Sequence, residues 1–579
     1  MAEGWTDELR VRVLDWVADD PDPVTREELA DLADLADGGD MAAIDDLADR
    51  FSADLDFGTA GLRGALGGGP NRMNLAVVIR TAAGIASWLE ETVGPDGRRS
   101  GVAVCFDARH RSADFAEASA AVFAAAGIRA HLLPGPLPTP VLAFAVRHLG
   151  AAAGVMVTAS HNPPQDNGYK VYDGTGRQIV APTDARIAKA MARVGRITSV
   201  PRTGPDDPDI LRLGDEVVAA YVAGASQAGR VPSARSVTTA YTALHGVGAA
   251  TFRRVMEAAG FPAPAEVPEQ VEPDPDFPTV AFPNPEEPGA LDLGLATASA
   301  AGAQVLIAND PDADRLGVAV PDPALGPPSS TGGWRALRGD EIGVVLAQHL
   351  LAHGGVAADA VFATTIVSSS LLGRMAAAVG VDYVETLTGF KWISRAAGEG
   401  RTLAFGYEEA LGFCVGDLVG DKDGLTAAVV FAEAVAVLAG EGRTVLDVLD
   451  DLAVTHGVHL TGQWSARVAG ADAMVQLAKA MSALRNHPPH ELAGRPVTSL
   501  TDLIDGDGRR GFPASDVLTL HLDGARIVVR PSGTEPKLKC YVEVVEPVAD
   551  AADLAAGRAR ADESLSALTA AIATATGLA

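Results

Sequence analysis

Three aspartates at alternate positions form the strongest chemical pattern in the sequence: Asp310, Asp312 and Asp314. They directly follow the apolar run AQVLIA, which is typical of a buried strand. If the loop curls, the three carboxylates converge on one hard cation such as Mg²⁺, Mn²⁺ or Ca²⁺. An EF-hand is excluded because the sixth position is Arg315 and the twelfth is Pro321. The alternative is a solvated acidic turn, but three crowded aspartates would repel one another without a cation.

A second candidate is the loop TASHNPP at 158–164, in which two prolines stiffen the chain around Ser160. A serine hydroxyl held in a fixed direction can carry an acyl or phosphoryl group when a base or metal activates it. The alternative is a turn serine that bonds its own backbone. A Ser-His-Asp hydrolase is disfavoured because no G-x-S-x-G elbow surrounds Ser160.

Two further loops offer polar groups in dense clusters. RPSGTEPK at 530–537 combines a guanidinium, two hydroxyls, a glycine and an ammonium, which together suit the outer oxygens of a phosphate; the alternative is a basic surface turn. GYEEALG at 406–412 offers paired carboxylates that can accept hydrogen bonds from sugar hydroxyls. Acidic pairs are usually solvated, so this second signal is weak by itself.

The elements that must position these loops alternate between short apolar runs and longer helical patterns, which indicates βαβ units around buried sheets. Strands are expected at 101–109, 153–160 and 303–308, and an Ala-rich amphipathic helix at 549–576. Ligands collect outside the carboxyl ends of such strands, where the polar loops begin. The stretch PDPALGPPSSTGG at 321–333 is predicted to be a linker.

Composition limits the possible functions of the chain. Its 579 residues suggest about four domains, and its net charge of −29 argues against extended nucleic-acid binding. Three distant cysteines exclude a disulfide framework, no P-loop occurs, and GDGRRG at 506–511 lacks the helix that a dinucleotide site needs. With no evident signal sequence or membrane span, we expect a cytoplasmic protein.

Five motifs in this order make the sequence similar to the α-D-phosphohexomutase family of phosphoglucomutases and phosphomannomutases: FGTAGLRG (57–64), TASHNPP (158–164), DPDADR (310–315), GYEEALG (406–412) and RPSGTEPK (530–537). They extend over almost the whole chain. Further segments, TALHGVG (242–248) and TLTGFKWI (386–393) among them, most resemble the phosphoglucomutase and phosphopentomutase branch.

The resemblance implies an α/β protein of four domains around a central cleft. Three are α/β domains with mixed sheets flanked by helices, and the fourth is a C-terminal α+β domain. The predicted boundaries are 1–212 with the phosphoserine loop, 213–328 with the metal loop, 329–448 with the sugar loop and 449–579 with the phosphate loop.

The resemblance also implies roles for individual residues. Ser160 is the phosphoserine, Asp310, Asp312 and Asp314 hold Mg²⁺ with a phosphoserine oxygen, and Lys170 is the general base, aided by His161. Arg63 and Arg315 line the cleft. Sugar binding is assigned to Glu408, Lys391 and Lys422, and binding of the non-reacting phosphate to Arg530, Ser532, Gly533, Thr534 and Lys537. For Lys170 to act as a base, we expect Arg63, Arg315 and the metal to depress its pKa.

The implied activity is reversible phosphoryl transfer between the 1- and 6-positions of a glucose or mannose phosphate, with a sugar 1,6-bisphosphate as primer and intermediate. The family usually has a serine where this chain has Ala410, so a pentose phosphate is the alternative substrate. A non-catalytic phospho-sugar binding protein and a metal-dependent phosphatase are the remaining alternatives. We expect sugar phosphates as the partners, no nucleic acid or membrane, and a monomer or dimer.

Overall fold

A computed structural model describes residues 4–58, 61–329, 332–354, 356–468, 472–532 and 537–578. The chain divides into two compact units. The first comprises Met1–Ala336 with Asp417–Ala432, and the second Leu337–Gly416 with Glu433–Ala579. Each unit contains two sheets.

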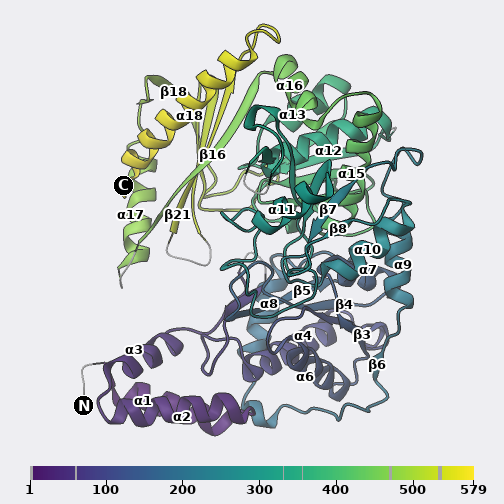
Figure 1. The fold of residues 1–579 in the computed structure, drawn as a ribbon. Helices are drawn as coiled ribbons and strands as arrows, with labels where there is room; N and C mark the ends of the chain where they lie inside the picture. The colour runs from purple at the N-terminus through teal and green to yellow at the C-terminus, as the bar shows by residue number, and fades with distance from the viewer. Residues whose placement is uncertain are drawn as a thin grey trace. The chain divides into compact units, whose positions relative to one another are not determined.

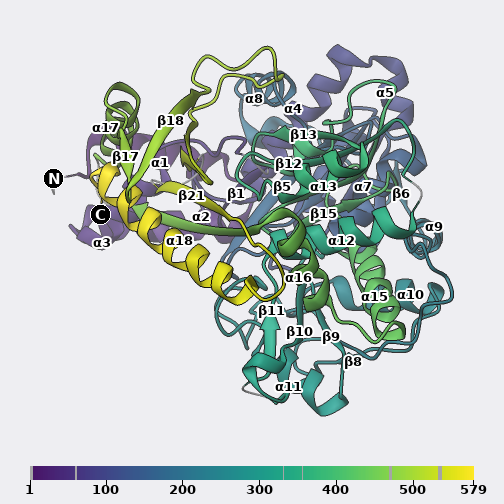
Figure 2. The same ribbon diagram turned by 90° about the horizontal axis from the view of Figure 1, so that it is seen from above.

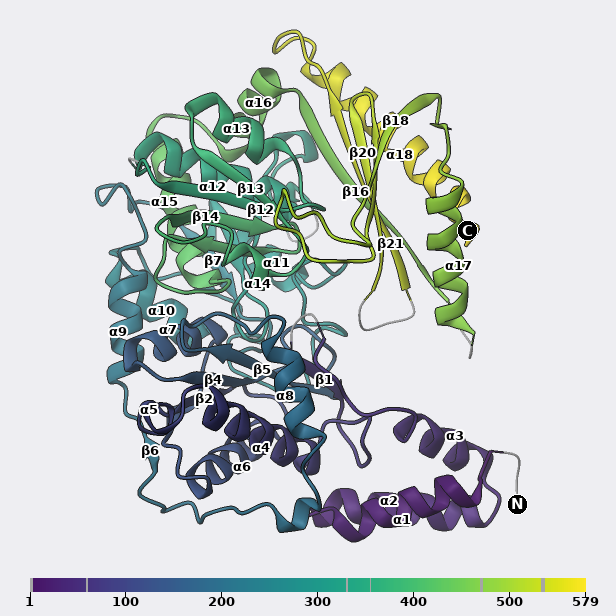
Figure 3. The same ribbon diagram turned by 180° about the vertical axis from the view of Figure 1, so that it is seen from behind.

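The first unit opens with three helices, α1 (Asp7–Asp19), α2 (Pro23–Asp37) and α3 (Met41–Arg50). Each begins at a side-chain cap: Thr6, Asp22 and Asp40 accept hydrogen bonds from backbone N–H groups of the first turns. The helices pack side by side (Figure 3) around a core that includes Val13, Leu29 and Leu47. Sequence reasoning had not predicted this small helical bundle.

The first sheet has six strands in the order β1-β5-β4-β2-β3-β6. Strands β2, β3, β4 and β6 are parallel, whereas β5 runs antiparallel to both β4 and β1. The strands are β1 (Leu62–Ala65), β2 (Val102–Phe106), β3 (Ala130–Pro136), β4 (Ala153–Val157), β5 (Asp166–Asp173) and β6 (Ile210–Arg212). The associated helices are α4 (Leu75–Thr92), α5 (Pro95–Ser100), α6 (Ser112–Ala125), α7 (Thr139–Leu149) and α8 (Thr183–Met191).

The second sheet, in the order β11-β10-β9-β7-β8, belongs to the same unit. Its strands are β7 (Thr239–Thr242), β8 (Ala265–Glu266), β9 (Val305–Ala308), β10 (Gly317–Pro321) and β11 (Trp334–Ala336), with helices α9 (Glu216–Ala225), α10 (Gly248–Ala258) and α11 (Asp292–Ala301). The prediction of a linker at 321–333 is wrong. Strand β11 pairs antiparallel with β10, so this stretch connects two strands of one sheet, which continues past the predicted boundary at residue 328.

The second unit begins with a four-stranded sheet in the order β13-β12-β14-β15. The strands are β12 (Ala360–Thr365), β13 (Asp382–Thr386), β14 (Thr402–Glu408) and β15 (Gly412–Val415). The helices of this unit are α12 (Gly339–His353), α13 (Leu371–Val379), α14 (Phe390–Ile393) and α16 (Val445–His456), together with the part of α15 (Gly424–Gly440) from Glu433 onwards.

The last sheet is fully antiparallel, in the order β16-β21-β20-β19-β18-β17. Its strands are β16 (Val458–Arg467), β17 (Glu491–Leu492), β18 (Arg495–Asp502), β19 (Leu518–Leu522), β20 (Ala525–Pro531) and β21 (Lys537–Glu546). Helices α17 (Ala473–Asn486) and α18 (Leu554–Thr576) share its core, and α18 runs along β16 and β21 (Figures 1 and 2). The predicted packing of the C-terminal helix against this domain is confirmed.

A buried carboxylate joins the two sheets of the second unit. Glu543 Oε1 on β21 accepts hydrogen bonds from Ser369 Oγ (2.9 Å) and from the backbone N–H of Ser370 (2.7 Å). Its Oε2 pairs with Arg526 Nε at 2.7 Å. Burial raises the pKa of Glu543, but the charge of Arg526 and the hydrogen bond from His459 outweigh burial and bring the pKa to about 2.

No single helix among the described residues is long and apolar enough to cross a membrane. One pair, α15 and α16, passes that test jointly by length and composition, with a bend of 89° between its two helices. The three cysteines, Cys105, Cys414 and Cys540, are buried and unpaired by disulfides. Burial raises the pKa of the Cys105 and Cys540 thiols to about 12.

Candidate active site

Three adjacent strands of the first sheet bring the predicted catalytic residues together. Arg63 lies on β1 opposite Gly168 of β5, and Lys170 lies on β5 opposite Met156 of β4. Ser160 follows the end of β4 by three residues. The strand order β1-β5-β4 therefore places these three residues at neighbouring positions, although they come from separate parts of the chain.

Ser160 occupies an unusual backbone conformation, with a φ of 54° in the left-handed region. The backbone is held there by a hydrogen bond from Ser160 N to Thr158 Oγ1 at 2.8 Å. The hydroxyl donates to Asp310 Oδ2 at 2.8 Å and lies 3.2 Å from Nδ1 of His161. Although only 2% of Ser160 is exposed, its side chain is therefore directed at the aspartate loop.

Arg109 holds the serine loop in shape, a role that sequence reasoning missed. Its guanidinium is buried and donates to backbone carbonyls of Ser160 (2.6 Å), Pro163 (2.7 Å) and Asp166 (3.1 Å), and also to that of Asn162. These carbonyls follow one another around the loop, so one side chain fixes the whole turn. The sequence placed Arg109 at the end of the strand expected at 101–109 and gave no sign of this role.

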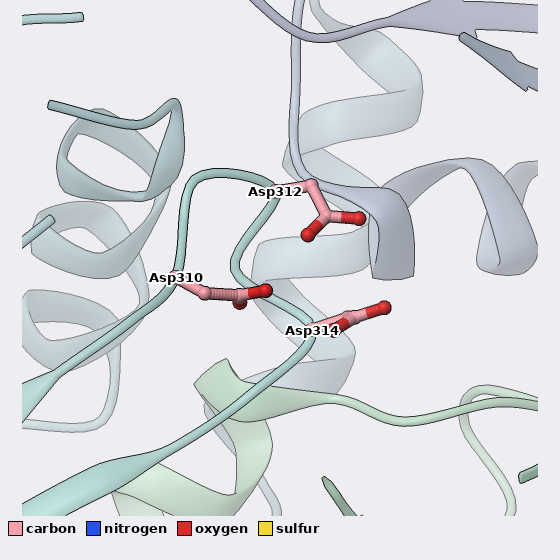
Figure 4. A group of neighbouring side chains, drawn as sticks. All are labelled: Asp310, Asp312 and Asp314. Atoms are coloured by element: carbon pink, nitrogen blue, oxygen red, sulfur yellow. The ribbon is translucent and has the colours of Figure 1, made fainter. Parts of the chain in front are cut away.

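The loop between β9 and β10 curls as the aspartate spacing predicts. Figure 4 shows the carboxylates of Asp310, Asp312 and Asp314 directed towards a common region. One oxygen from each lies within 4.8 Å of the others, and all three residues are fully buried. A backbone hydrogen bond from Val247 N to Pro311 O, at 2.8 Å, braces the loop against the turn after β7.

Two lysines and a threonine surround the aspartates. Lys170 Nζ lies 2.7 Å from Asp312 Oδ2 and 2.9 Å from Asp314 Oδ2. Lys422 Nζ lies 3.3 Å from the same Asp314 oxygen, and Thr139 Oγ1 donates to Asp312 Oδ2 at 2.6 Å. Thr139 had not been predicted as part of the site; it begins α7, whose sequence resembles an ordinary helix N-terminus.

Two carboxylate oxygens in this cluster remain without a hydrogen-bond partner: Asp312 Oδ1 and Asp314 Oδ1. Buried carboxylate oxygens are costly to leave unpaired. Unpaired oxygens from neighbouring aspartates, together with an oxygen of Asp310, form an all-oxygen donor set that suits a hard divalent cation. The residues present therefore fit Mg²⁺.

The electrostatics of the cluster correct one expectation. Burial lowers the pKa of Lys170, but the charges of Asp312 and Asp314 outweigh burial and the nearby cations, so the pKa lies above its ordinary value. Arg63 and Lys422 lower the pKa of Lys170, but their effect is smaller than that of the two aspartates. Burial raises the pKa of Asp310, and the charges of Asp312 and Asp314 raise it further.

His161 and Arg315 complete this part of the site. Burial and the positive charges of Arg315 and Arg63 hold the pKa of His161 well below its usual range, so the imidazole is neutral. Arg315 Nε lies 3.9 Å from Asp310 Oδ2, and Nη1 lies 3.8 Å from Glu286. Arg63 donates to Asn162 Oδ1 at 3.4 Å.

The predicted sugar and phosphate residues other than Lys422 belong to the second unit. Lys391 lies on α14, Glu408 ends β14, Arg530 lies on β20 and Lys537 begins β21. Ser532 follows β20, and Gly533 and Thr534 lie outside the described residues. Within this unit, Glu408 and Arg530 both act electrostatically on Tyr541: burial raises the pKa of Tyr541, the Glu409 and Glu408 carboxylates raise it further, and Arg530 opposes this.

The sequence also matches known family models. Four of them describe the α/β/α domains I, II and III and the C-terminal domain of phosphoglucomutase/phosphomannomutase. They match residues 54–196, 219–325, 338–455 and 500–561. The chain belongs to the phosphoglucomutase/phosphomannomutase family. The sequence resemblance and the predicted α/β class are thereby confirmed, and the helices α1–α3 precede the first matched region.

Members of the family with different names resemble this chain. A "Probable phosphomannomutase" of Haemophilus influenzae is 43% identical over 478 residues, which cover 81% of this chain and 93% of that protein. Human phosphopentomutase is 34% identical over 575 residues, covering 92% and 90%. A phosphoglucomutase/phosphomannomutase family structure from Burkholderia thailandensis matches with a TM-score of 0.63 at 20% identity, over 88% of this chain and 97% of that one. The protein is thus a phosphohexomutase-family enzyme, a mutase of the isomerase type, and the family depends on Mg²⁺.

Proposed function

We propose that this enzyme transfers a phosphoryl group reversibly between the 1- and 6-positions of a glucose or mannose phosphate. Ser160 is the covalent carrier, and a sugar 1,6-bisphosphate is the intermediate and primer. The observation that carries the proposal is the 2.8 Å contact between the Ser160 hydroxyl and Asp310 of the buried aspartate cluster. A nucleophilic hydroxyl beside a divalent-cation site is the arrangement that phosphoryl transfer requires.

Asp310, Asp312 and Asp314 would hold Mg²⁺. When bound, Mg²⁺ neutralises charge that develops on the oxygens of the transferred phosphoryl group. The ammonium of Lys170, 2.7 Å from Asp312 and 2.9 Å from Asp314, adds a second positive charge for the same oxygens. Arg63 lies next to the serine loop through Asn162 and can contribute a third.

The proposed reaction has two balanced halves. In the first, a sugar hydroxyl attacks phosphorus, the bond between phosphorus and Ser160 Oγ breaks, and the proton that the sugar hydroxyl gives up is balanced by one taken up at Ser160 Oγ. In the second, Ser160 Oγ loses that proton and attacks the other phosphate of the sugar bisphosphate. The bond between that phosphorus and its sugar oxygen breaks, and the sugar oxygen takes up a proton. Neutral His161, with Nδ1 at 3.2 Å from Ser160 Oγ, is placed to accept the proton that Ser160 loses. In this proposal Lys170 binds the phosphoryl oxygens as an ammonium, and its predicted role as the base for the sugar hydroxyl is the alternative.

A phosphopentomutase acting on ribose or deoxyribose 1- and 5-phosphates is the second candidate. Ala410 cannot supply the hydroxyl that a serine would offer to a hexose. Relatives named phosphopentomutase and phosphoribomutase match over 91% to 92% of this chain. These observations support a pentose phosphate as the second candidate substrate, and they do not exclude a hexose phosphate.

A substrate panel tests the proposal. Glucose 1-phosphate, mannose 1-phosphate and ribose 1-phosphate are supplied with Mg²⁺, with and without the matching sugar bisphosphate, and with EDTA. We expect isomerised sugar phosphate from a hexose, primer stimulation, and loss of turnover in EDTA and in Ser160→Ala. Preference for ribose 1-phosphate would favour the second candidate. Release of free phosphate would indicate a phosphatase, binding without turnover would indicate a binding protein, and full activity of Ser160→Ala would exclude Ser160 as carrier.

A further inference from the structure

The segment Asp421-Lys422-Asp423 precedes α15 and belongs to the first unit, although the chain on either side of 417–432 belongs to the second. All three residues are buried, with exposed fractions of 1%, 7% and 1%. Lys422 reaches Asp314 of the aspartate cluster at 3.3 Å. Two buried carboxylates therefore flank a lysine at the candidate active site.

Asp421 is held by the first sheet. Its Oδ2 accepts hydrogen bonds from the hydroxyl of Tyr172 (2.9 Å) and from Gln178 Nε2 (2.7 Å). Tyr172 is fully buried on β5, two residues after Lys170. The backbone N–H of Lys422 donates to Asp421 Oδ1 at 2.8 Å, so the carboxylate also fixes the main chain at Lys422.

Asp423 is held by α9. The hydroxyl of Tyr221, which is fully buried, lies 2.8 Å and 3.0 Å from the two carboxylate oxygens. Asp423 Oδ1 also accepts from the backbone N–H groups of Leu425 (2.9 Å) and Thr426 (3.1 Å), at the start of α15. The position of the helix start and the position of Lys422 are thereby linked through one carboxylate.

Neither carboxylate forms an ion pair with any residue in the described parts of the chain; their partners are hydroxyl, amide and backbone groups. Burying two carboxylates without a cation is unfavourable, and directional neutral donors compensate by fixing geometry rather than by neutralising charge. This arrangement is expected where a fixed position of the segment contributes more to function than the segment contributes to the free energy of folding.

Two glycines allow the segment to approach its surroundings closely. A Cβ on Gly424 would lie 2.2 Å from the backbone oxygen of Arg315 in the metal loop. A Cβ on Gly420 would lie 2.8 Å from the backbone oxygen of Gly176, in the turn after β5. The segment is therefore packed against the backbone of both the sheet and the metal loop, which leaves Lys422 little freedom to move.

We propose that Tyr172 and Tyr221 are positioning residues that act through Asp421 and Asp423 to hold the Lys422 ammonium beside Asp314. This inference rests on the proposed function and on the sugar-binding role that the family resemblance implies for Lys422, which lies beside Asp314. The two hydroxyls come from β5 and α9 and form hydrogen bonds to the carboxylates on either side of the lysine. Without these two hydroxyls, Lys422 remains in the chain but its ammonium is no longer held beside Asp314.

A double-mutant cycle tests the proposal. The variants Tyr172→Phe, Tyr221→Phe and their combination are assayed in the natural background and in Lys422→Met. We expect the combined variant to lower kcat/KM about tenfold or more, because hydrogen bonds to charged groups are lost. In the Lys422→Met background the same two changes should lower kcat/KM less than about twofold, because the residue through which they act is gone.

Tyr169→Phe is the matched control. Tyr169 is also fully buried on β5, but its hydroxyl donates to Ser119 at 2.9 Å and not to the 421–423 segment. We expect this control to leave kcat/KM within about twofold of the natural protein. Equal losses from the two tyrosine changes with and without Lys422, or no loss at all, would overturn the proposal.

Two further measurements keep the outcomes separate. If the combined tyrosine variant does not fold, Tyr221→Phe alone and Asp421→Asn carry the same cycle, and thermal unfolding identifies any merely structural loss. Ser160→Ala is assayed in parallel. If it retains turnover, the proposed function fails; if it is inactive while the tyrosine variants behave as the natural protein, only the positioning role fails.

Discussion

Two buried carboxylate clusters, one in each unit, differ in how fully their oxygens are satisfied. At Glu543 in the second unit, Oε1 accepts hydrogen bonds from Ser369 and Ser370, and Oε2 pairs with Arg526. In the first unit, Asp312 and Asp314 share the ammonium of Lys170, yet each keeps one buried oxygen without a partner. Both clusters are buried, but only at Glu543 do both carboxylate oxygens have partners within the protein.

This difference in hydrogen bonding distinguishes a carboxylate that stabilises the fold from a carboxylate cluster that binds a ligand. A carboxylate whose two oxygens both have protein partners stabilises the fold, and adding a ligand would break existing bonds. A cluster that retains oxygens aimed at a common region lacks partners that only a ligand can supply. The number of carboxylate oxygens without a protein partner therefore distinguishes the two clusters, whereas charge and burial do not.

The largest expected effect is on catalysis, from Asp310→Asn. The amide has no negative charge for the cation and replaces one carboxylate oxygen by an NH₂ donor, so kcat should fall about a thousandfold or more. The pKa of Asp310 is raised in the metal-free protein, and asparagine resembles the protonated carboxyl, so the melting temperature in EDTA should hardly change. Turnover with Mg²⁺ and calorimetry in EDTA measure the two quantities. A large loss of stability would contradict the assignment of this cluster as a ligand site.

Glu543→Gln should show the opposite behaviour. The pKa of Glu543 is about 2, below its ordinary value, so this residue should contribute about 3 kcal/mol of stability at neutral pH. That contribution is present above pH about 4.5 and is lost as the pH falls towards 2. Urea unfolding of both proteins from pH 7 to pH 3 measures it; the difference should shrink in acid, while kcat at pH 7 stays within about threefold. A difference independent of pH would refute the ionic origin.

Arg109→Lys tests the support of the serine loop. A lysine cannot reach the several carbonyls that the guanidinium holds, so Ser160 should lose its fixed direction. We expect kcat to fall about 30-fold, equivalent to about 2 kcal/mol, with little change in Mg²⁺ affinity. Arg111→Lys is the control. Arg111 lies on the same loop as Arg109, between β2 and α6, but pairs with Asp22 and Asp114, so this variant should retain kcat. Similar losses in both variants would show that the whole loop, not Arg109, responds.

The smallest expected effect concerns Glu409, a half-buried neighbour of Glu408. Burial and the charges of Glu408 and Asp340 raise the pKa of Glu409 to about 7. A raised pKa favours folding below pH about 4.5, and this advantage disappears as the pH rises through 7. Glu409→Gln should therefore stabilise the protein by about 1.5 kcal/mol at pH 8 and leave it unchanged at pH 4.5. Chemical unfolding at both values checks this, and equal effects at the two values would contradict it.

The convergence of Ser160 with the aspartate loop was predicted from the family resemblance, while the position of both motifs after buried strands predicted only that each lies at the end of its own sheet. Sequence reasoning failed where contacts between residues far apart in the chain determine a pKa or a hydrogen-bond partner. The pKa direction of Lys170 depends on two aspartates from another sheet, and Thr139 lies far from Asp312 in sequence. Strand β11 has only three residues, too few for an apolar alternation to appear, so its connection to β10 resembled a linker.

The burial of all three thiols has a practical consequence. Cys105, Cys414 and Cys540 are at most 3% exposed, which shields all three from maleimides and iodoacetamides. The raised pKa of Cys105 and Cys540 slows the reaction of these two thiols further at neutral pH. A cysteine introduced at a chosen surface position should therefore be labelled selectively without first replacing the native ones. Paired fluorophores or spin labels could then follow substrate-driven motion in a protein whose interior is unaltered.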